Sequence, residues 1–311
     1  MTLDKHRVLI TGGAGFVGSA VARTLRDTGA TVDIVDNLFA GRRGLVPAEA
    51  TFHEHDIRSD ELRETLQVCD PTVIVHLAAV HSIPYCNEHP ETAFNVNVMG
   101  TRTLLDAARQ LDTLEQVVYA STAAVYPPRT EAHTEDTPPD PIGVYGRTKL
   151  IGEDLAQLFH ADTGVPTAST RLFNIYGPNE TNDHLVPAII GQLRNGRAEL
   201  ELGNLTPKRD FVYKEDVVRA IIEILSTFDG GYRVYNVGTG TAHSVKDVVE
   251  CTAEVLGEDI AITQDETRTR TNDREQLLAD TTRIRREIGW QPQTEFSDGL
   301  RLLLVSEGLI E

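Results

Sequence analysis

The stretch Val8-Leu-Ile-Thr-Gly-Gly-Ala-Gly-Phe-Val-Gly18 decides the fold of this chain. Its apolar and β-branched start predicts a buried strand, and the pattern of apolar residues over 17–27 predicts a helix. Between them the glycines have the spacing Gly12-x-x-Gly15-x-x-Gly18. Such a turn brings backbone N–H groups and a helix N-terminus up to a pyrophosphate. The sequence therefore predicts a dinucleotide site that includes Gly12, Gly15, Phe16, Val17 and Gly18.

The next predicted strand, 31–36, ends at a carboxylate that suits a ribose. Asp36 is placed to accept hydrogen bonds from both ribose hydroxyls, and Asn37 belongs to the same predicted site. Because the charge of Asp36 would repel a 2′-phosphate, NAD is favoured over NADP. Arg42 and Arg43 follow closely and are either solvated loop residues or contacts for such a phosphate.

Strand and helix patterns alternate through the first half of the chain. Strands are predicted at 7–11, 31–36, 73–78, 117–121 and 166–172, and helices at 17–27, 59–66, 91–109 and 145–163. This rhythm predicts an α/β fold, a doubly wound parallel (Rossmann) sheet covered by helices on both faces. Asp56 and Ile57 follow the region of a third strand, where they either meet the adenine ring or form a helix N-cap pair.

After residue 177 the rhythm loosens, with helices predicted at 185–195 and 245–256 and a strand at 232–238. We expect residues 1–172 to form the NAD-binding Rossmann domain. Residues 173–311 are expected to form mainly a smaller, C-terminal substrate-binding lobe, with segments near 211–256 returning to the Rossmann domain.

The charge of the chain limits its partners. Against 47 Asp and Glu residues there are 29 Lys and Arg, a formal net charge of −18, which argues against nucleic acid as a partner. Only five of the basic residues are lysines. This composition is typical of proteins adapted to a salty cytoplasm, and an ordinary acidic enzyme is the alternative.

Other features point to a cytoplasmic protein with no metal. The polar N-terminus leads straight into a strand, which argues against a signal peptide, and the longest apolar stretch, 73–80, is too short to span a membrane. Cys69, Cys86 and Cys251 have no spacing suited to zinc and are expected to be buried thiols.

A second group of residues predicts a catalytic site. Tyr145 and Lys149 are four residues apart, so they lie on one face of the predicted helix 145–163. A lysine there is expected to lower the pKa of the phenol and to make it a usable base. Ser121 and Thr122 end the strand before, at the edge of the sheet where ligands bind in open α/β folds. Hydroxyl, phenol and ammonium are therefore predicted to converge beside the nicotinamide.

Taken together, these motifs resemble those of the extended short-chain dehydrogenases/reductases, in particular the nucleotide-sugar epimerase/dehydratase family. The resemblance covers essentially the whole chain. Besides the glycine loop and the Tyr145/Lys149 pair, the matching strings are His76-Leu-Ala-Ala79, Asn97-Val-Met-Gly-Thr101, Ser121-Thr-Ala-Ala-Val-Tyr126, Arg171-Leu-Phe-Asn-Ile-Tyr-Gly-Pro178, Arg209-Asp-Phe-Val-Tyr213, Tyr235-Asn-Val-Gly238, Ala279-Asp280 and Ile288-Gly-Trp-Gln-Pro292.

The resemblance implies a role for each matching residue. Tyr145 would be the base, Lys149 its partner and an anchor for the nicotinamide ribose, and Thr122 the hydroxyl bonded to the reacting oxygen of the sugar, with Ser121 sharing that role. The cofactor cleft would be lined by Ala78, Ala79 and Asn97, and His81 is either a cofactor contact or a polar loop residue. The nucleotide diphosphate would be bound by Asn174, Arg209 and Arg270.

Within the family, Ala123-Ala124 indicates the reaction. Dehydratases of the family carry an acid at this place, which protonates the leaving hydroxyl, and alanine cannot do so. The resemblance therefore favours inversion at carbon 4 of a UDP-sugar through a transient 4-keto sugar. UDP-glucose and UDP-galactose are the simplest pair. The alternatives are a nucleotide-sugar dehydratase or reductase, and an NAD-binding regulator without catalysis.

Three departures from the family pattern leave the sugar open. Pro127 replaces the usual glycine, His184 stands where an asparagine is common, and Leu277 occupies the position that limits room for an N-acetyl group. The family also usually forms homodimers through the helices predicted at 91–109 and 145–163. Leu104, Leu105 and Ala108 suit either that interface or the core.

Overall fold

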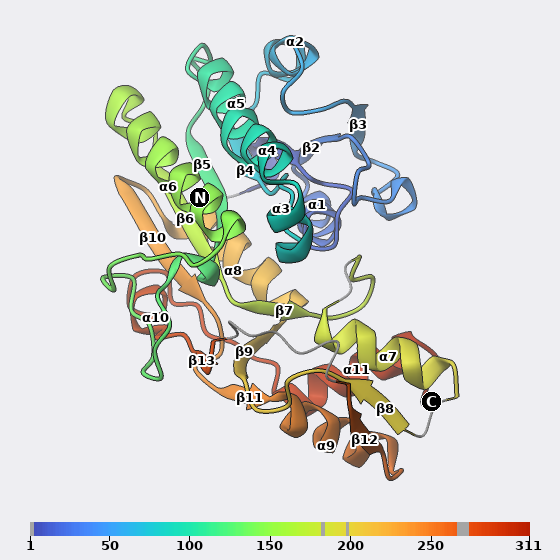
Figure 1. Ribbon diagram of the computed structural model, residues 1–311. Helices are drawn as coiled ribbons and strands as arrows, with labels where there is room; N and C mark the ends of the chain where they lie inside the picture. The colour runs from blue at the N-terminus through green and yellow to red at the C-terminus, as the bar shows by residue number, and fades with distance from the viewer. Residues whose placement is uncertain (1–2, 182–183, 197–198, 266–273) are drawn as a thin grey trace.

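The computed structural model describes residues 3–181, 184–196, 199–265 and 274–311 (Figure 1). Its main sheet is parallel throughout and has the strand order β10-β6-β5-β4-β1-β2-β3. These strands are β1 (Arg7–Thr11), β2 (Thr31–Asp36), β3 (Thr51–Glu54), β4 (Val73–His76), β5 (Gln116–Thr122), β6 (Thr167–Leu172) and β10 (Tyr232–Val237).

The order of the strands reverses between β1 and β4. From β1 the chain continues to β2 and β3 on one side, and from β4 it continues to β5 and β6 on the other. Loops that leave the carboxyl ends of β1 and β4 therefore run in opposite directions, which opens a crevice between them. The expectation of a doubly wound Rossmann sheet is confirmed, and the crevice is where such folds bind ligands.

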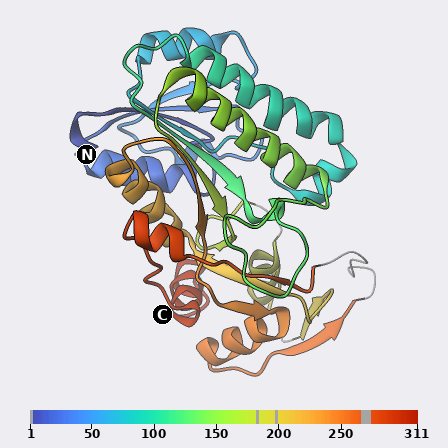
Figure 2. The same ribbon diagram turned by 90° about the vertical axis from the view of Figure 1, so that its left-hand side faces the viewer.

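Helices cover both faces of this sheet, as Figure 2 shows. One face is covered by α1 (Gly18–Asp27), α8 (Lys214–Thr227) and α10 (Thr282–Glu287), and the other by α2 (Glu61–Cys69), α5 (Thr101–Ala108) and α6 (Val144–Thr163). Alternation along β1 explains how one short strand serves both layers. Val8 and Ile10 pack with α1 and α8, whereas Leu9 packs with α2 and α5.

The helix predicted over 91–109 is interrupted. It consists of α4 (Pro90–Phe94), a π-helical turn at Asn95–Gly100 and then α5, and a short helix, α3 (Ile83–Glu88), precedes it. The turn rotates Asn97 into the protein, where its side chain is 1% exposed. A wider turn at this position is a feature that a regular helical period does not reveal.

The second lobe is built around β9 (Lys208–Tyr213), which pairs with three short strands: β7 (Asn174–Tyr176), β11 (Ala242–Ser244) and β13 (Gln276–Leu277). A separate pair joins β8 (Glu199–Leu202) to β12 (Ala261–Gln264). These strands share a core with α7 (Leu185–Arg194), α9 (Val245–Leu256) and α11 (Phe296–Ser306), which lie together in Figure 1.

The segment 211–256 was expected to return to the Rossmann domain, and the structure differs for its last part. Helix α8 and strand β10 do join the large sheet and its helical layer. Strand β11 and helix α9 do not, because the buried side chains of α9, Val248 and Val249, pack into the core of the lobe. Among the helices of the described residues, none is long and apolar enough to cross a membrane.

Candidate active site

A cleft of about 1560 Å³ runs from the glycine loop after β1 to the inner surface of the lobe. Its wall includes the carboxyl ends of β1, β2, β4 and β5, the start of α6 and residues of β7, β9 and α7. Nearly all the predicted site residues of the described chain meet here: Gly12, Gly15, Phe16, Val17, Gly18, Asp36, Asn37, Asp56, Ile57, Ala78, Ala79, His81, Ser121, Thr122, Tyr145, Lys149, Asn174 and Arg209.

The glycine loop packs closely against the ends of β2 and β4. Gly12 has a φ of +73°, and its N–H donates to the Val35 carbonyl at 2.8 Å. A Cβ added to Gly12 would lie 2.7 Å from the backbone nitrogen of Ala78, on the neighbouring strand's loop. Only glycine combines this backbone conformation with this close approach. Gly15 is different, since a Cβ there would have only the Gly12 carbonyl within 4 Å.

Replacing Gly12 with alanine should therefore damage the loop. Left-handed strain and the clash with Ala78 are expected to cost about 1–3 kcal/mol of stability and to weaken NAD binding. Gly44→Ala is the matched control, because Gly44 has no atom within 4 Å of an added Cβ. Chemical unfolding and an NAD titration measure both effects. Equal behaviour of the two variants would contradict this account of the loop.

Asp36 connects the glycine loop to the loop that follows β2. Its carboxylate accepts hydrogen bonds from the backbone N–H of Ala14 at 3.0 Å and of Leu38 at 2.8 Å. Burial raises the pKa of Asp36, against the effect of these two hydrogen bonds. Each carboxylate oxygen keeps a further lone pair, so the group can still accept hydrogen bonds from a ribose. Arg43 stacks on Phe52, with its guanidinium carbon 4.3 Å from the ring centroid.

Asp56 and Ile57 do not form a helix N-cap pair. Helix α2 begins at Glu61 after Asp60, whereas Asp56 accepts hydrogen bonds from the Arg58 side chain at 2.7 Å and from Asn37 at 2.9 Å. The hydrogen bonds from Arg58 lower the pKa of Asp56 and keep it ionised. Both residues line the cleft next to Asp36, which leaves the adenine side as their predicted role.

The residues at this end of the cleft fit a dinucleotide. A pyrophosphate would fit against Gly15, which has an open side, and the N-terminus of α1. The Asp36 carboxylate would then accept hydrogen bonds from the ribose. NAD supplies an oxidant for a secondary alcohol when it is bound. Phe16, Val17 and Ile57 add apolar surface to the same wall.

Tyr145, Thr122 and Lys149 converge where β5 ends and α6 begins. The Thr122 hydroxyl is hydrogen-bonded to the Tyr145 phenol, and Lys149 follows one turn later on α6. The Lys149 ammonium lies 4.3 Å from the ring centroid of Tyr119, and Lys149 is 3% exposed. A phenol, a hydroxyl and an ammonium thus share one small, water-poor corner of the cleft.

The pKa values differ in sign from the expectation for this pair. Burial raises the pKa of Tyr145 to about 12, while its hydrogen bond with Thr122 acts in the opposite direction. Burial also lowers the pKa of Lys149 to about 7, and the nearby Glu153 carboxylate acts to raise it. Desolvation is therefore the largest cause of both pKa shifts.

Beneath this corner lies a buried ionic network that sequence reasoning missed. Glu153, one turn after Lys149, accepts hydrogen bonds from Arg171 at 3.0 and 2.7 Å, and both side chains are 5% exposed. The Ser121 hydroxyl donates to the same Glu153 carboxylate. The i, i+4 spacing from Lys149 was a signal for Glu153, but no helical period connects it to Arg171, which lies on the next strand, β6.

Asn97 does not line the cleft. Its amide accepts from the Val80 N–H at 2.7 Å and donates to the Val80 carbonyl at 2.8 Å and to Thr148 at 3.0 Å. It therefore holds the loop after β4 against α6 from behind the wall. His76 acts similarly, bridging Thr11 at 2.6 Å and Thr101 at 2.8 Å, and burial lowers its pKa to about 3.

The lobe side of the cleft carries Asn174 and two arginines. Arg209 donates to the carbonyls of Lys208 at 2.8 Å and of Arg274 at 2.9 Å. Arg274, which sequence reasoning missed, donates to the Ala124 carbonyl at 3.0 Å and so ties the lobe to the end of β5. Leu277 also lines the cleft, whereas Arg270 lies outside the described residues.

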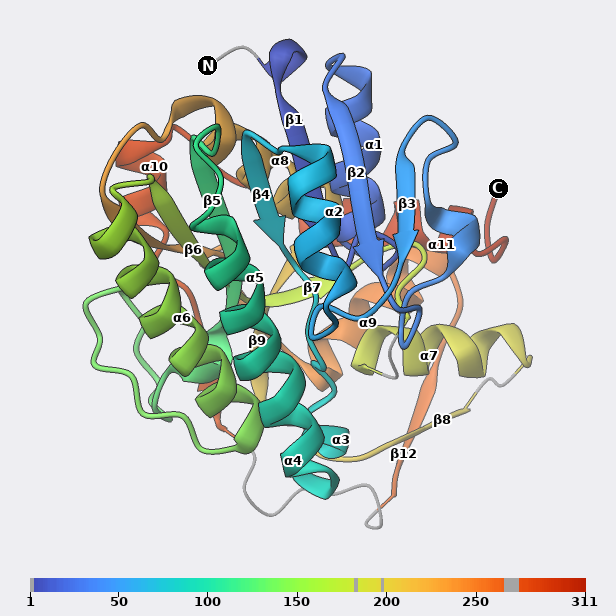
Figure 3. The same cartoon turned by 90° about the horizontal axis from the view of Figure 1, so that it is seen from above.

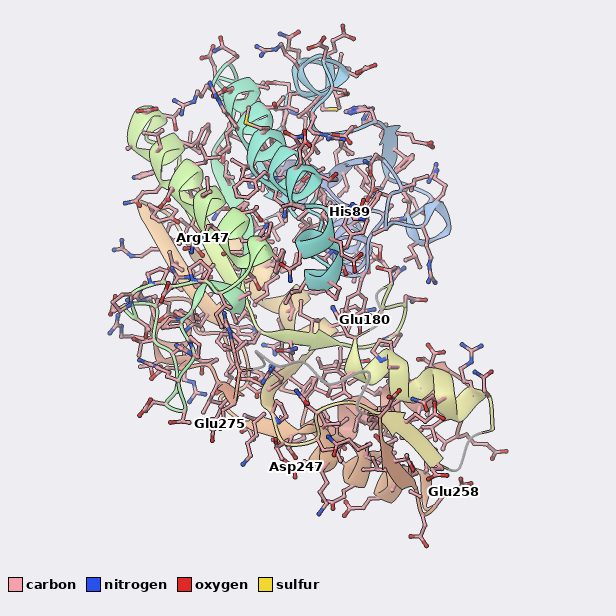
Figure 4. All side chains as sticks on the ribbon, in the orientation of Figure 1. His89, Arg147, Glu180, Asp247, Glu258 and Glu275 are labelled. Carbon is pink, nitrogen blue, oxygen red and sulfur yellow. The ribbon has the colours of Figure 1, made fainter. Side chains whose placement is uncertain are left out.

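Two histidines and a glutamate complete the wall. His184 directly precedes α7, and its Nδ1 lies 2.6 Å from the carboxylate of Glu180, which Figure 4 marks on the segment between β7 and α7. The Glu180 side chain is only 5% exposed. The ring centroid of His81 lies 6.4 Å from that of His184. Burial lowers the pKa of His81 to about 4, so this ring is neutral.

The fold and the cleft define a class of protein: a Rossmann-fold enzyme with the glycine loop and the Tyr-x-x-x-Lys pair of the short-chain dehydrogenases/reductases. Residues 8–238 match the model of the NAD dependent epimerase/dehydratase family. The chain therefore belongs to this family, whose cofactor is NAD, and the resemblance noted from the motifs is confirmed.

Known proteins are similar to this chain along nearly its whole length. The chain is 34% identical over 304 residues to a UDP-glucose 4-epimerase of Corynebacterium glutamicum, a match that covers 92% of this chain and 91% of the relative. It also resembles a UDP-glucose 4-epimerase of Thermotoga maritima solved with UDP-glucose (TM-score 0.90, 28% identity, 96% and 97% of the chains) and that of Thermus thermophilus solved with NAD (0.88, 31%, 97% and 98%).

Proposed function

We propose that this protein inverts carbon 4 of a UDP-sugar with NAD as a resident cofactor, and that UDP-glucose and UDP-galactose are the simplest substrate pair. One observation carries the proposal: the Thr122–Tyr145–Lys149 corner is complete, and the two residues after Thr122 are alanines. Alanine cannot protonate a leaving hydroxyl, which removes the acid that elimination needs. The names of the relatives support the same reaction.

Each residue of the corner has one task in this proposal. The glycine loop and Asp36 would hold NAD, which would supply reversible oxidation of a secondary alcohol. Tyr145 accepts the proton of the 4-hydroxyl group and later returns it, with Thr122 hydrogen-bonded to the same oxygen. The Lys149 ammonium stabilises the phenolate of Tyr145. Asn174, Arg209 and Arg270 hold the diphosphate, so that the sugar is free to present its other face.

Incubation of the protein with UDP-glucose in molar KCl, followed by NMR, tests the proposal. We expect a mixture of UDP-glucose and UDP-galactose with no net formation of NADH. A product that has lost water would favour a dehydratase, and net NADH would favour a dehydrogenase or reductase. Tight NAD binding without turnover of any nucleotide sugar would favour a regulator.

We further propose that the protein works as a homodimer in a salty cytoplasm. The excess of acidic residues supports the second part, because such surfaces stay hydrated when charges are screened. Leu104, Leu105 and Ala108 do not support the first part, since all three are buried in the core. Other side chains on the same helical pair do: Phe94, Met99 and Leu158 are 37%, 45% and 52% exposed.

The dimer has its own test. These three side chains belong to α4, the π-helical turn and α6, and α5 and α6 run side by side in Figures 1 and 3. Leu158→Glu should convert a dimer into a monomer on light scattering. Val68→Glu is the control, because Val68 is 82% exposed on α2 and lies outside that pair. A monomeric parent protein, or a dimer that survives Leu158→Glu, would contradict the assignment.

A further inference from the structure

Three side chains with metal-binding atoms meet on the sheet face that α2 covers. Asp33 comes from β2, His53 from the neighbouring edge strand β3 and Cys69 from the end of α2. One ligand atom of each lies within 4.8 Å of the other two. None of the three residues lines the cleft of the active site. The role of this Asp33–His53–Cys69 cluster is therefore separate from the proposed reaction.

The contacts within the cluster converge on one nitrogen atom. The Asp33 carboxylate lies 2.8 Å from His53 Nε2, and the Cys69 sulfur lies 3.6 Å from the same atom. The Cys69 sulfur and an Asp33 carboxylate oxygen lie within 4.8 Å of each other. A Cys-His-Asp relay needs the acid on one ring nitrogen and the thiol on the other. With both partners on Nε2, the arrangement excludes a relay and forms a triangle of sulfur, nitrogen and oxygen.

The dimensions of the triangle suit a tetrahedral ion. Zinc bonds of about 2.3 Å to sulfur and about 2.0–2.1 Å to nitrogen and oxygen, at tetrahedral angles, separate sulfur from nitrogen by roughly 3.5 Å and nitrogen from oxygen by roughly 3.3 Å. The observed sulfur–nitrogen distance is 3.6 Å. The Asp33–His53 distance of 2.8 Å would have to open by roughly 0.5 Å, which is a rotation of the carboxylate.

The surroundings leave room for a fourth ligand. The side chains of His53 and Asp33 are 23% and 12% exposed, and Cys69 is half-buried, so water reaches the site. A thiolate and an imidazole with a single carboxylate select zinc and similar transition metals, whereas magnesium and calcium require oxygen ligands. The cysteine spacing along the chain gives no sign of the site, because each ligand comes from a different element.

We propose that Asp33, His53 and Cys69 bind a Zn²⁺ ion, with water as the fourth ligand, and that the ion fastens the edge strand β3 and the end of α2 to β2. On binding, the thiol releases its proton to solvent, the imidazole keeps its proton on Nδ1 and Nε2 donates its lone pair to the metal. No electron is transferred. A bound ion stabilises the folded state by mass action, so the stability of this edge of the sheet depends on zinc.

Titration of the metal-free protein with Co²⁺ under anaerobic conditions tests the site. We expect one equivalent per chain, with the sulfur-to-cobalt charge-transfer band and the visible bands of a tetrahedral ion, and displacement of both by Zn²⁺. Cys69→Ser should lose the charge-transfer band and weaken binding at least 100-fold, while Cys251→Ser should bind like the parent. His53→Gln should weaken binding but keep sulfur ligation, which gives a second variant if Cys69→Ser folds poorly.

Several results would overturn the site. They are the absence of the charge-transfer band in the parent protein, its persistence in Cys69→Ser, and its loss in Cys251→Ser. Thermal unfolding with Zn²⁺ and with EDTA gives an independent readout: the parent should unfold at a higher temperature with Zn²⁺, and Cys69→Ser should show no difference. The cluster is remote from the cleft, so the NMR assay of UDP-glucose tests the proposed function independently of the metal.

Discussion

Tyr145→Phe is expected to lower kcat for the interconversion of UDP-glucose and UDP-galactose by roughly 10²- to 10⁴-fold, which is the usual contribution of a positioned general base. The reason is chemical and local. Phenylalanine keeps the ring that fills this corner, but it removes the oxygen that is hydrogen-bonded to Thr122 and would take the proton of the sugar. NAD binding should be nearly unchanged, because the glycine loop and Asp36 are not affected.

Tyr235→Phe provides the matched control. This tyrosine is buried, and its phenol donates to Glu287 at 3.2 Å on the opposite side of the sheet. Epimerisation followed by NMR and the NAD content of the purified variants are the two measurements. If Tyr145→Phe kept most of its activity, or if both variants lost it equally, Tyr145 would not be the base.

Glu153→Gln is expected to have the largest effect on stability, about 3–5 kcal/mol. The carboxylate of Glu153 is the acceptor for both the Arg171 guanidinium and the Ser121 hydroxyl, in a place with almost no access to water. A glutamine offers one oxygen in place of two and turns an amide N–H₂ group towards other donors. The buried charge of Arg171 is then left without its counter-ion.

Chemical unfolding in molar KCl measures this effect. Asp154→Asn is the control, because it makes the same type of change on the adjacent, exposed residue and should alter stability by less than about 0.5 kcal/mol. Similar values for the two variants would mean that the Glu153–Arg171 pair is not a stabilising contact. Combining Glu153→Gln with Arg171→Met should recover part of the loss, since the unpaired charge is removed.

Local patterns explain what the sequence predicted well. The glycine loop, the strand before it and the helix after it lie next to each other along the chain, so one short stretch contains the whole turn. The same holds for Tyr145 and Lys149, which one helical turn brings together. The sheet itself followed from the alternation of elements, and its strands at β1, β2 and β10 differ from their predicted ranges by at most one residue.

Properties that depend on distant contacts were not predictable in the same way. The pKa of Tyr145 is governed by burial, which comes from all the elements around the cleft. Asn97 belongs to a π-helical turn and does not line the cleft. Its side-chain amide contacts the loop after β4 and Thr148 on α6. The stretch 210–228 divides into the end of β9 and helix α8. The pairing of the short strands of the lobe left no periodic pattern to read.

The position of β10 in the large sheet has a consequence for how the chain acquires its structure. Strand β10 pairs with β6, yet in the chain it comes after β7, α7, β8 and β9, which build the lobe. During synthesis, β6 would remain an unpaired edge strand until β10 has been made. The sheet face that α1 covers would also lack α8 until that helix has been made. Unpaired strand edges and uncovered apolar faces favour aggregation of nascent chains. An N-terminal fragment that ends before α8 therefore lacks both the pairing of β6 and the cover of α8, and it should be poorly folded.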